Sequence, residues 1–128
     1  MTGLSGWAGW AGLAVAGMIG APCRYLLDGW VGRRTAGPFP WGTLVVNVSG
    51  SLLLGLVAGA ALYHGFPNTP RVWLGSGFCG AYTTFSTFAF ETVRLVEEGL
   101  PAAALRYVAL SLMAGTAAAA VGLALAAL

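Results

Sequence analysis

Four long stretches of mostly apolar residues divide the chain, near residues 4–27, 41–63, 71–96 and 101–128. At about 1.5 Å of rise per residue, each stretch is long enough as an α-helix to cross a hydrocarbon core of roughly 30 Å. The segments between them carry Gly, Pro and charged residues, as in HGFPNTP and EEGLP, and such residues are typical of turns at a membrane surface. The pattern predicts an all-α membrane protein in which one domain, residues 1–128, contains four transmembrane helices.

The composition strengthens this prediction. Of the 128 residues, 58% are hydrophobic and only 8% are charged, and the mean hydropathy is +0.80, which argues against a soluble domain. The net charge of +2 is small and scattered, so the sequence gives no sign of a nucleic-acid partner. Cys23 and Cys79 lack the spacing of metal ligands, and we interpret them as small packing residues within helices rather than as a disulfide.

Arginines mark the ends of the predicted helices unequally. Arg33 and Arg34 lie in the first loop, and Arg94 and Arg106 flank the same predicted face of the membrane, whereas Arg71 marks the other face. The positive-inside rule therefore favours a chain with both termini outside. The bias is modest, however, and insertion in both orientations stays open.

Polar and small residues recur at every fourth position of the second stretch, as Thr43, Asn47, Ser51, Gly55 and Gly59. At 3.6 residues per turn such a stripe winds slowly around the helix, so we expect it to face other protein. Close helix packing explains the glycines. An amide near the middle of the membrane needs hydrogen-bond partners, and either a neighbouring helix or a pathway lined by water or ions would supply them to Asn47.

Residues 77–91, GFCGAYTTFSTFAFE, combine glycines with Ser and Thr hydroxyls inside the third stretch. Glycine is a poor helix former, and these hydroxyls can bond their own backbone, so we predict a break in the third helix near residues 80–84. Unwound backbone at membrane depth needs protein or a cavity to satisfy it. Carbonyl groups that point inward there would form a cation site.

Two pairs of residues spaced three apart follow this break. Phe85 and Phe88 share one helical face, and Thr84 and Thr87 share an adjacent one. Phenylalanine most often serves packing. The edge of an aromatic ring carries positive potential, however, so ring edges beside hydroxyl donors also suit a path for a small anion.

Further polar groups lie near the predicted helix ends. Arg24 closes a face of small residues on the first helix and is either a snorkelling side chain or a functional one. Tyr107 and Ser111 place two polar groups near one end of the fourth helix. Glu91, one turn beyond the phenylalanine pair, is interpreted either as a vestibule group that faces water or as the partner of Arg94.

Three segments resemble the signature regions of the Fluc/CrcB family of bacterial fluoride channels: GAPCRY in the first helix, GTLVVNVSGSLLLG in the second and GFCGAYTTFSTFAFE in the third. The chain length, the four-helix plan and the order of the motifs agree as well, so the resemblance covers essentially the whole chain. It implies a fluoride-specific ion channel, not an enzyme. Such a channel gives passive fluoride efflux across the inner membrane of a bacterium and so lowers the toxicity of cytoplasmic fluoride.

The resemblance also implies an assembly and a set of site residues. Two antiparallel subunits of dual topology form a dimer with two fluoride pathways, and the backbone carbonyls of Gly80 and Thr83 from both subunits enclose a structural Na⁺ that is not transported. Arg24 lies in an aqueous vestibule and attracts anions. The other matched positions line the fluoride pathway, with Asn47 as a hydrogen-bond donor, Phe85 and Phe88 through their ring edges, and Thr84, Thr87, Tyr107 and Ser111 through their hydroxyls.

Other classes of membrane protein stay open. A small four-helix multidrug-type exporter needs an intramembrane carboxylate early in the chain, and the first predicted helix has none. An intramembrane hydrolase needs a nucleophile with a base, and the only histidine, His64, lies in a predicted loop. A non-transporting membrane assembly subunit fits the composition, although packing alone does not require so many hydroxyls.

Overall fold

The computed structural model describes residues 4–128, and all regular structure in that range is helical. Three elements are long: α1 (Gly6–Gly32), α2 (Trp41–His64) and α6 (Pro101–Leu125). Between α2 and α6 the chain forms four shorter elements, which are α3 (Asn68–Val72), the π-helix η1 (Trp73–Cys79), α4 (Gly80–Tyr82) and α5 (Ser86–Glu97). The prediction of an all-α protein is confirmed for the residues described.

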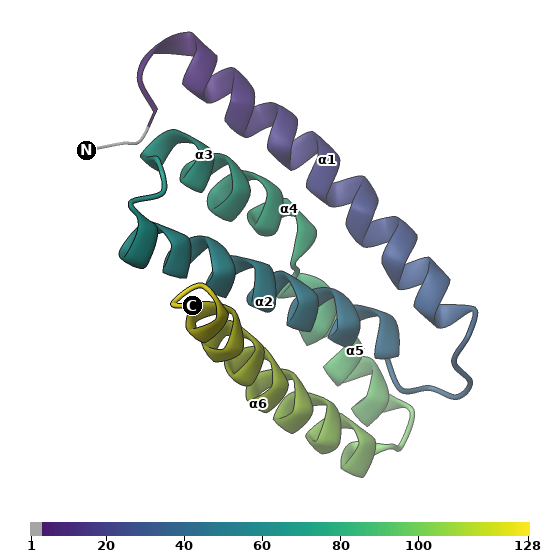
Figure 1. The fold of residues 1–128 in the computed structure, drawn as a ribbon. Coiled ribbons are helices and arrows are strands. Elements are labelled where there is room, and N and C mark those ends of the chain that lie inside the picture. The colour runs from purple at the N-terminus through teal and green to yellow at the C-terminus, as the bar shows by residue number, and fades with distance from the viewer. Residues whose placement is uncertain (1–3) are drawn as a thin grey trace.

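Helices α1, α2 and α6 are each long and apolar enough to span a bilayer. The third predicted span, residues 71–96, is not one continuous helix, because it runs through η1 and α4 to a break and then continues as α5. Figure 1 shows α3, α4 and α5 following one another along the length of the molecule. Length and hydropathy single out three helices, so the count of four membrane crossings stays a prediction.

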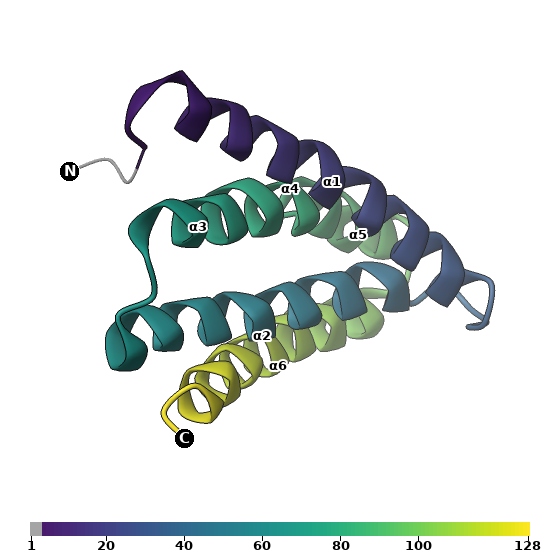
Figure 2. The ribbon, with the colours of Figure 1, turned by 45° about the horizontal axis from the view of Figure 1, so that its top comes forward.

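Helices α1 and α6 lie on opposite sides of the molecule, with α2 and the segment from α3 to α5 between them (Figures 1 and 2). The most apolar window of α2 is 33% buried, against 6% for the corresponding windows of α1 and α6. Large apolar side chains such as Met18 and Met113 are exposed on these two outer helices. An exposed apolar helix surface suits contact with lipid, which agrees with a membrane protein.

Glycines set the contact between α2 and α6. A Cβ atom on Gly55 would meet the backbone of Ala119, and a Cβ atom on Gly122 would meet the backbone carbonyl of Leu52. Small residues at these positions let the two backbones approach closely. The glycine end of the α2 stripe thus packs against another helix, as its pattern predicts.

The small-residue face of α1 packs against η1 and α4. A Cβ atom on Gly20 would lie 2.5 Å from the Phe78 carbonyl oxygen, and one on Gly77 would lie 2.9 Å from the Ala16 methyl group. Cys79 of η1 is buried, Cys23 of α1 is half-buried, and both are free thiols. Their interpretation as packing residues agrees with this arrangement.

The first helix is longer than its apolar pattern indicates. It ends at Gly32 instead of near residue 27, and so it includes Asp28. Hydropathy marks where a chain leaves an apolar environment, whereas a helix ends where its backbone hydrogen bonds end, and the two points need not coincide. The expectation that the first helix has no carboxylate is therefore wrong, because the C-terminal part of this helix contains Asp28.

The break in the third segment lies at residues 83–85. Thr83 is extended, with φ −78° and ψ 161°, and its N–H and hydroxyl both donate to the Cys79 carbonyl, at 2.9 and 2.8 Å. A threonine hydroxyl that bonds local backbone in this way competes with helix continuation. The break starts later than the predicted range of 80–84, since Gly80 is still helical, and the π-helix before it is a feature that the sequence pattern does not predict.

Candidate functional site

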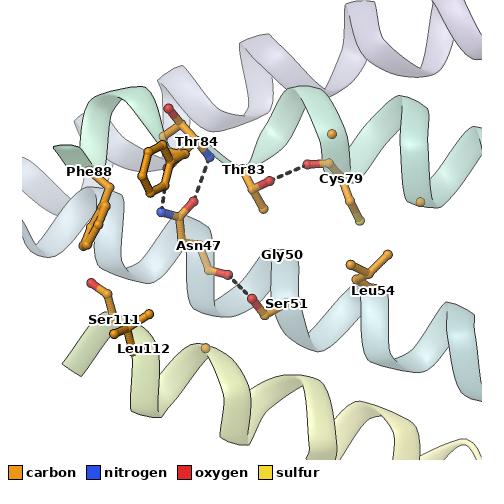
Figure 3. A pocket seen from close by; sticks show the side chains of 14 residues that line it. Asn47, Gly50, Ser51, Leu54, Cys79, Thr83, Thr84, Phe88, Ser111 and Leu112 are labelled. Carbon is orange, nitrogen blue, oxygen red and sulfur yellow. Dashed lines mark hydrogen bonds between the residues drawn. The ribbon is translucent and has the colours of Figure 1, made fainter. Parts of the chain in front are cut away.

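An open groove of about 380 Å³ lies beside the break. Its walls come from α2, α6 and the interrupted segment (Figure 3). Most residues that the sequence marks as an ion site line this groove, namely Asn47, Gly80, Thr83, Thr84, Phe85, Phe88 and Ser111. The fold therefore brings three distant parts of the chain to one groove, in which several polar groups stand among mostly apolar surface.

Asn47 of α2 holds the unwound backbone at Thr84. Its Nδ2 donates to the Thr84 carbonyl at 2.9 Å, and its Oδ1 accepts from the Thr84 N–H at 2.8 Å, as Figure 3 shows. Unpaired backbone groups at membrane depth cost several kcal/mol each, so both bonds support the break where it stands. A carboxamide nitrogen carries two hydrogens, and Thr84 uses one. The second remains as a donor at the groove.

The Thr84 hydroxyl organises the start of α5. It accepts from the Thr87 N–H at 3.1 Å, donates to the Thr87 hydroxyl at 3.1 Å and lies 3.3 Å from the Ser86 hydroxyl. The first N–H groups of a helix have no partner within the helix, and a side-chain oxygen just before them supplies one. The Thr84 hydroxyl, in a residue that lines the groove, therefore already donates to Thr87.

Phe85 and Phe88 are adjacent, as their spacing predicts. Their ring centroids lie 5.8 Å apart at an interplanar angle of 43°. The Phe88 ring is half-buried and lies 5.2 Å from the Tyr107 ring, whereas Phe85 is 78% exposed. One ring is thus held by the protein core, and the other stands at the mouth of the groove without a comparable support in the single chain.

The serines of the groove differ in their bonding. Ser51 of α2 donates to the Asn47 carbonyl of its own helix at 2.8 Å, as Figure 3 shows. Ser111 of α6 makes no hydrogen bond with any other described residue. Its hydroxyl is therefore available as a donor in the groove, on the wall opposite Asn47 in Figure 3.

Arg24 and Thr87 line a second, smaller hollow of about 220 Å³, on α1, α2 and α5. Thr84 lines this hollow as well as the groove, so both spaces border the break. The Nη1 of Arg24 donates to the Thr83 carbonyl at 3.5 Å, which is a long contact. Asp28 shares the hollow with Arg24, so the positive charge there has a carboxylate nearby.

Tyr107 does not reach the groove. Its side chain is fully buried, and its hydroxyl donates to Glu91 Oε2 at 2.9 Å. Arg94, which the sequence offers as a partner of Glu91, forms an ion pair with Glu98, with 3.7 Å between its Nε and Oε1. Of the two fourth-helix positions predicted to line the pathway, Ser111 therefore lies in the groove and Tyr107 lies behind it.

The pairing of Glu91 with Tyr107 is the contact that sequence reasoning missed. A signal for it exists, since Glu91 and Tyr107 each lie eight residues from Gly99 (99 − 91 = 8; 107 − 99 = 8) in the turn that joins α5 to α6. Helices joined by a short turn run antiparallel side by side, so positions equidistant from the turn meet.

The residues proposed for Na⁺ have different backbone states. Thr83 is extended and follows α4, whereas Gly80 is helical. Both residues line the groove, and the Thr83 carbonyl accepts the long contact from Arg24. In the part of the chain described, no group of three or more His, Cys, Asp or Glu side chains is arranged to hold a metal ion. A cation here would therefore depend on backbone and hydroxyl oxygens, which are ligands that hard cations accept.

These features define an all-helical membrane protein with a polar groove at an interrupted helix. Residues 11–123 match the family model described as CrcB-like protein, Camphor Resistance (CrcB). The chain belongs to this family, and the resemblance seen in its motifs is confirmed.

Relatives in this family carry a channel name. The chain is 48% identical to the fluoride-specific ion channel FluC 1 of Frankia casuarinae, over 89% of this chain and 93% of that protein. It is 47% identical to FluC 2 of Mycolicibacterium paratuberculosis, over 95% and 94%, and 43% identical to FluC 1 of Nitrobacter hamburgensis, over 84% and 86%. A channel name, and not an enzyme name, agrees with the expectation that this chain is not an enzyme.

Proposed function

We propose that this chain is a subunit of a fluoride-specific ion channel that lets fluoride leave the cell passively through the inner membrane of a bacterium. The observation that carries the proposal is the groove at residues 83–85, where hydrogen-bond donors and phenylalanine rings meet at membrane depth. The names of the relatives support the same ion. Efflux of this kind would lower the toxicity of cytoplasmic fluoride.

The chemistry of the groove suits a small, strongly hydrated anion. Such an ion enters a pore only if donors replace its water, and a bare positive charge would serve larger anions equally well. The free Nδ2 hydrogen of Asn47 and the Ser111 hydroxyl are donors of this kind. Phe85 and Phe88 add ring edges with positive potential. The Thr84 hydroxyl donates to the Thr87 hydroxyl, so it would need to turn to contact the ion, whereas the Thr87 proton is not engaged in this bond.

The open groove also supports assembly into an antiparallel dimer of dual topology. A polar groove that faced hydrocarbon would leave its donors and carbonyls unsatisfied. The Phe85 ring, 78% exposed in the single chain, lies at the same surface. We propose that a second, inverted copy covers this surface and completes the pathway.

We also propose that Na⁺ is a structural ion of the dimer, held by carbonyl oxygens of Gly80 and Thr83 from both subunits. The extended conformation of Thr83 supports this, because a carbonyl at a helix end is free of the helical ladder. The Arg24 guanidinium approaches the same carbonyl at 3.5 Å. Two cations at one oxygen repel each other, so Na⁺ binding would favour an Arg24 side chain turned toward the hollow that it lines.

The same observations argue against two other classes of membrane protein. An exporter of organic cations would use a carboxylate within its pathway, and the first-helix carboxylate, Asp28, lines the smaller hollow beside Arg24 and not the groove. A non-transporting assembly subunit has no need of a Ser111 hydroxyl that lines an open groove without a hydrogen-bond partner.

Ion efflux from liposomes tests the function. Purified protein is reconstituted in liposomes loaded with both fluoride and chloride, and the two ions are followed with selective electrodes. We expect fast fluoride release without chloride release, while protein-free liposomes release neither. Equal release of both ions, or no fluoride release with Na⁺ present, would refute the proposal.

The structural Na⁺ has its own measurement. The protein is exchanged into buffers with Na⁺ or with N-methylglucamine as the cation, and dimer content is measured by size-exclusion chromatography before fluoride flux is assayed. We expect dimer and flux to fall together without Na⁺ and to return when it is restored. Fluoride flux that is unchanged after complete removal of Na⁺ would contradict the sodium site and leave the channel itself intact.

A further inference from the structure

A second open hollow adjoins the groove and leads toward the start of α3. It measures about 680 Å³ and lies between α2 and the elements α3 and η1, with Arg71 and Ser76 among its lining residues. Leu54 and Gly75 line both this hollow and the groove. The hollow therefore borders the groove at these two residues, and Arg71 lines it. We call this space the Arg71 hollow.

The side-chain charge at this end of the molecule is positive. The chain has four acidic side chains, and they lie late in α1 or from the middle of α5 onward, at Asp28, Glu91, Glu97 and Glu98. In Figure 1 the C-terminal ends of α1 and α5 lie at the opposite end of the molecule from α3. Arg71 donates to the neutral Asn68 Oδ1 at 2.5 Å, and no described carboxylate pairs with it. Its charge is therefore not neutralised by a neighbour.

We propose that Arg71 attracts small inorganic anions into the groove, so that the pathway carries one guanidinium on each side of the break, Arg24 on one and Arg71 on the other. This rests on the proposed function, because it takes the groove as the route of fluoride. An exposed cation raises the local concentration of anions without the tight binding that would hold them there. Arg71 is thus a steering group, and its contribution depends on its charge and on its position.

The test changes the charge after the protein has inserted. Arg71→Cys protein is reconstituted in liposomes and treated with methanethiosulfonate reagents that attach a trimethylammonium, a neutral or a sulfonate group. Any effect of Arg71 on membrane orientation is already complete at that stage, so differences among the three products report the charge alone. The wild-type chain, treated identically, controls for reaction at Cys23 and Cys79.

We expect the initial fluoride efflux to be fastest with the ammonium and slowest with the sulfonate, with roughly a threefold or greater ratio between them at low ionic strength. The ratio should approach one near 1 M salt, where the screening length is about 3 Å. Arg106→Cys is the matched control, since Arg106 lies on α6 and lines neither the groove nor the Arg71 hollow. Its three products should conduct equally.

Each outcome has one meaning. Equal rates for the three Arg71→Cys products, or the same spread of rates for Arg106→Cys, would overturn the role of Arg71. A wild-type protein that releases no fluoride would overturn the proposed function itself, and the labelling experiment would not be needed to see it. The two failures are therefore distinguishable.

Discussion

The Asn47→Ala substitution would remove both bonds that hold the Thr84 backbone. A buried donor or acceptor left without its partner costs about 1–3 kcal/mol, and the substitution strands one of each, so about 2–6 kcal/mol is at stake. Thr84 is 9% exposed, and water from the groove can reach it. We therefore expect the lower part of this range, about 2–3 kcal/mol, as the loss in free energy of unfolding.

Three measurements check this expectation. Unfolding of the protein in mixed micelles titrated with sodium dodecyl sulfate gives the free energy, and hydrogen exchange read by mass spectrometry reports the amides of residues 83–87. Liposome efflux gives the fluoride flux. We expect lower stability, faster exchange at the break and reduced flux together, because the same side chain supports the backbone and faces the ion.

Ser51→Ala is the matched control. Ser51 lies one turn along the same helix and lines the same groove, but its hydroxyl bonds only the carbonyl of its own helix. A substitution of this kind usually changes stability by less than about 0.5 kcal/mol. If Asn47→Ala resembles Ser51→Ala in stability and in exchange, the bond to Thr84 does not support the break. A loss of flux alone would then assign Asn47 to the ion and not to the backbone.

The remaining predictions concern packing around the groove. Phe88→Ala should destabilise the subunit by about 2–4 kcal/mol, since the Phe88 ring packs against Tyr107. Phe85→Ala should lower fluoride flux but cost the isolated subunit less than about 1 kcal/mol, because the Phe85 ring is 78% exposed. Unfolding of both variants by titration with detergent measures this difference in stability. Tyr107→Phe should cost about 1–3 kcal/mol by leaving Glu91 without its donor, and most of this loss should vanish in a Glu91→Ala background, where no acceptor is left unpaired. Gly55→Leu should separate α2 from α6 and cost about 1–3 kcal/mol or more, which thermal unfolding followed by tryptophan fluorescence would detect.

Much of the fold is predictable from local patterns. Apolar length predicts the long helices, and the every-fourth-residue stripe predicts that one face of α2 packs against other protein. The stripe explains several contacts in turn, since Thr43 is buried, Asn47 bonds the break and Gly55 packs on α6. Glycine and hydroxyl content predicts a break in the third segment, and the break occurs. These features follow from residue type and spacing along one element, which a sequence displays directly.

The features that escaped prediction depend on neighbours distant in the sequence. A lone amide at membrane depth shows that Asn47 needs partners, but only the packing of α2 against the break shows that they are the two backbone groups of Thr84. The burial of Tyr107 likewise depends on the α5–α6 hairpin, which places Glu91 beside it. The π-helix at Trp73–Cys79 packs against α1, and the pattern of its residues does not predict it.

In the proposed channel, assembly and conduction would depend on the same atoms of the break and the groove. The groove stays open along one side, where the Phe85 ring is largely exposed and the Ser111 hydroxyl has no hydrogen-bond partner among the described residues. In lipid, such a surface needs either water or protein, and an ion pathway closed by a second copy would provide both. A variant that loses flux is therefore informative only when its assembly is measured as well. Phe85 and Asn47 form the most useful pair for this purpose. Phe85 lies at the exposed surface, so its substitution should affect the dimer, whereas Asn47 bonds within its own subunit, so its substitution should affect the break.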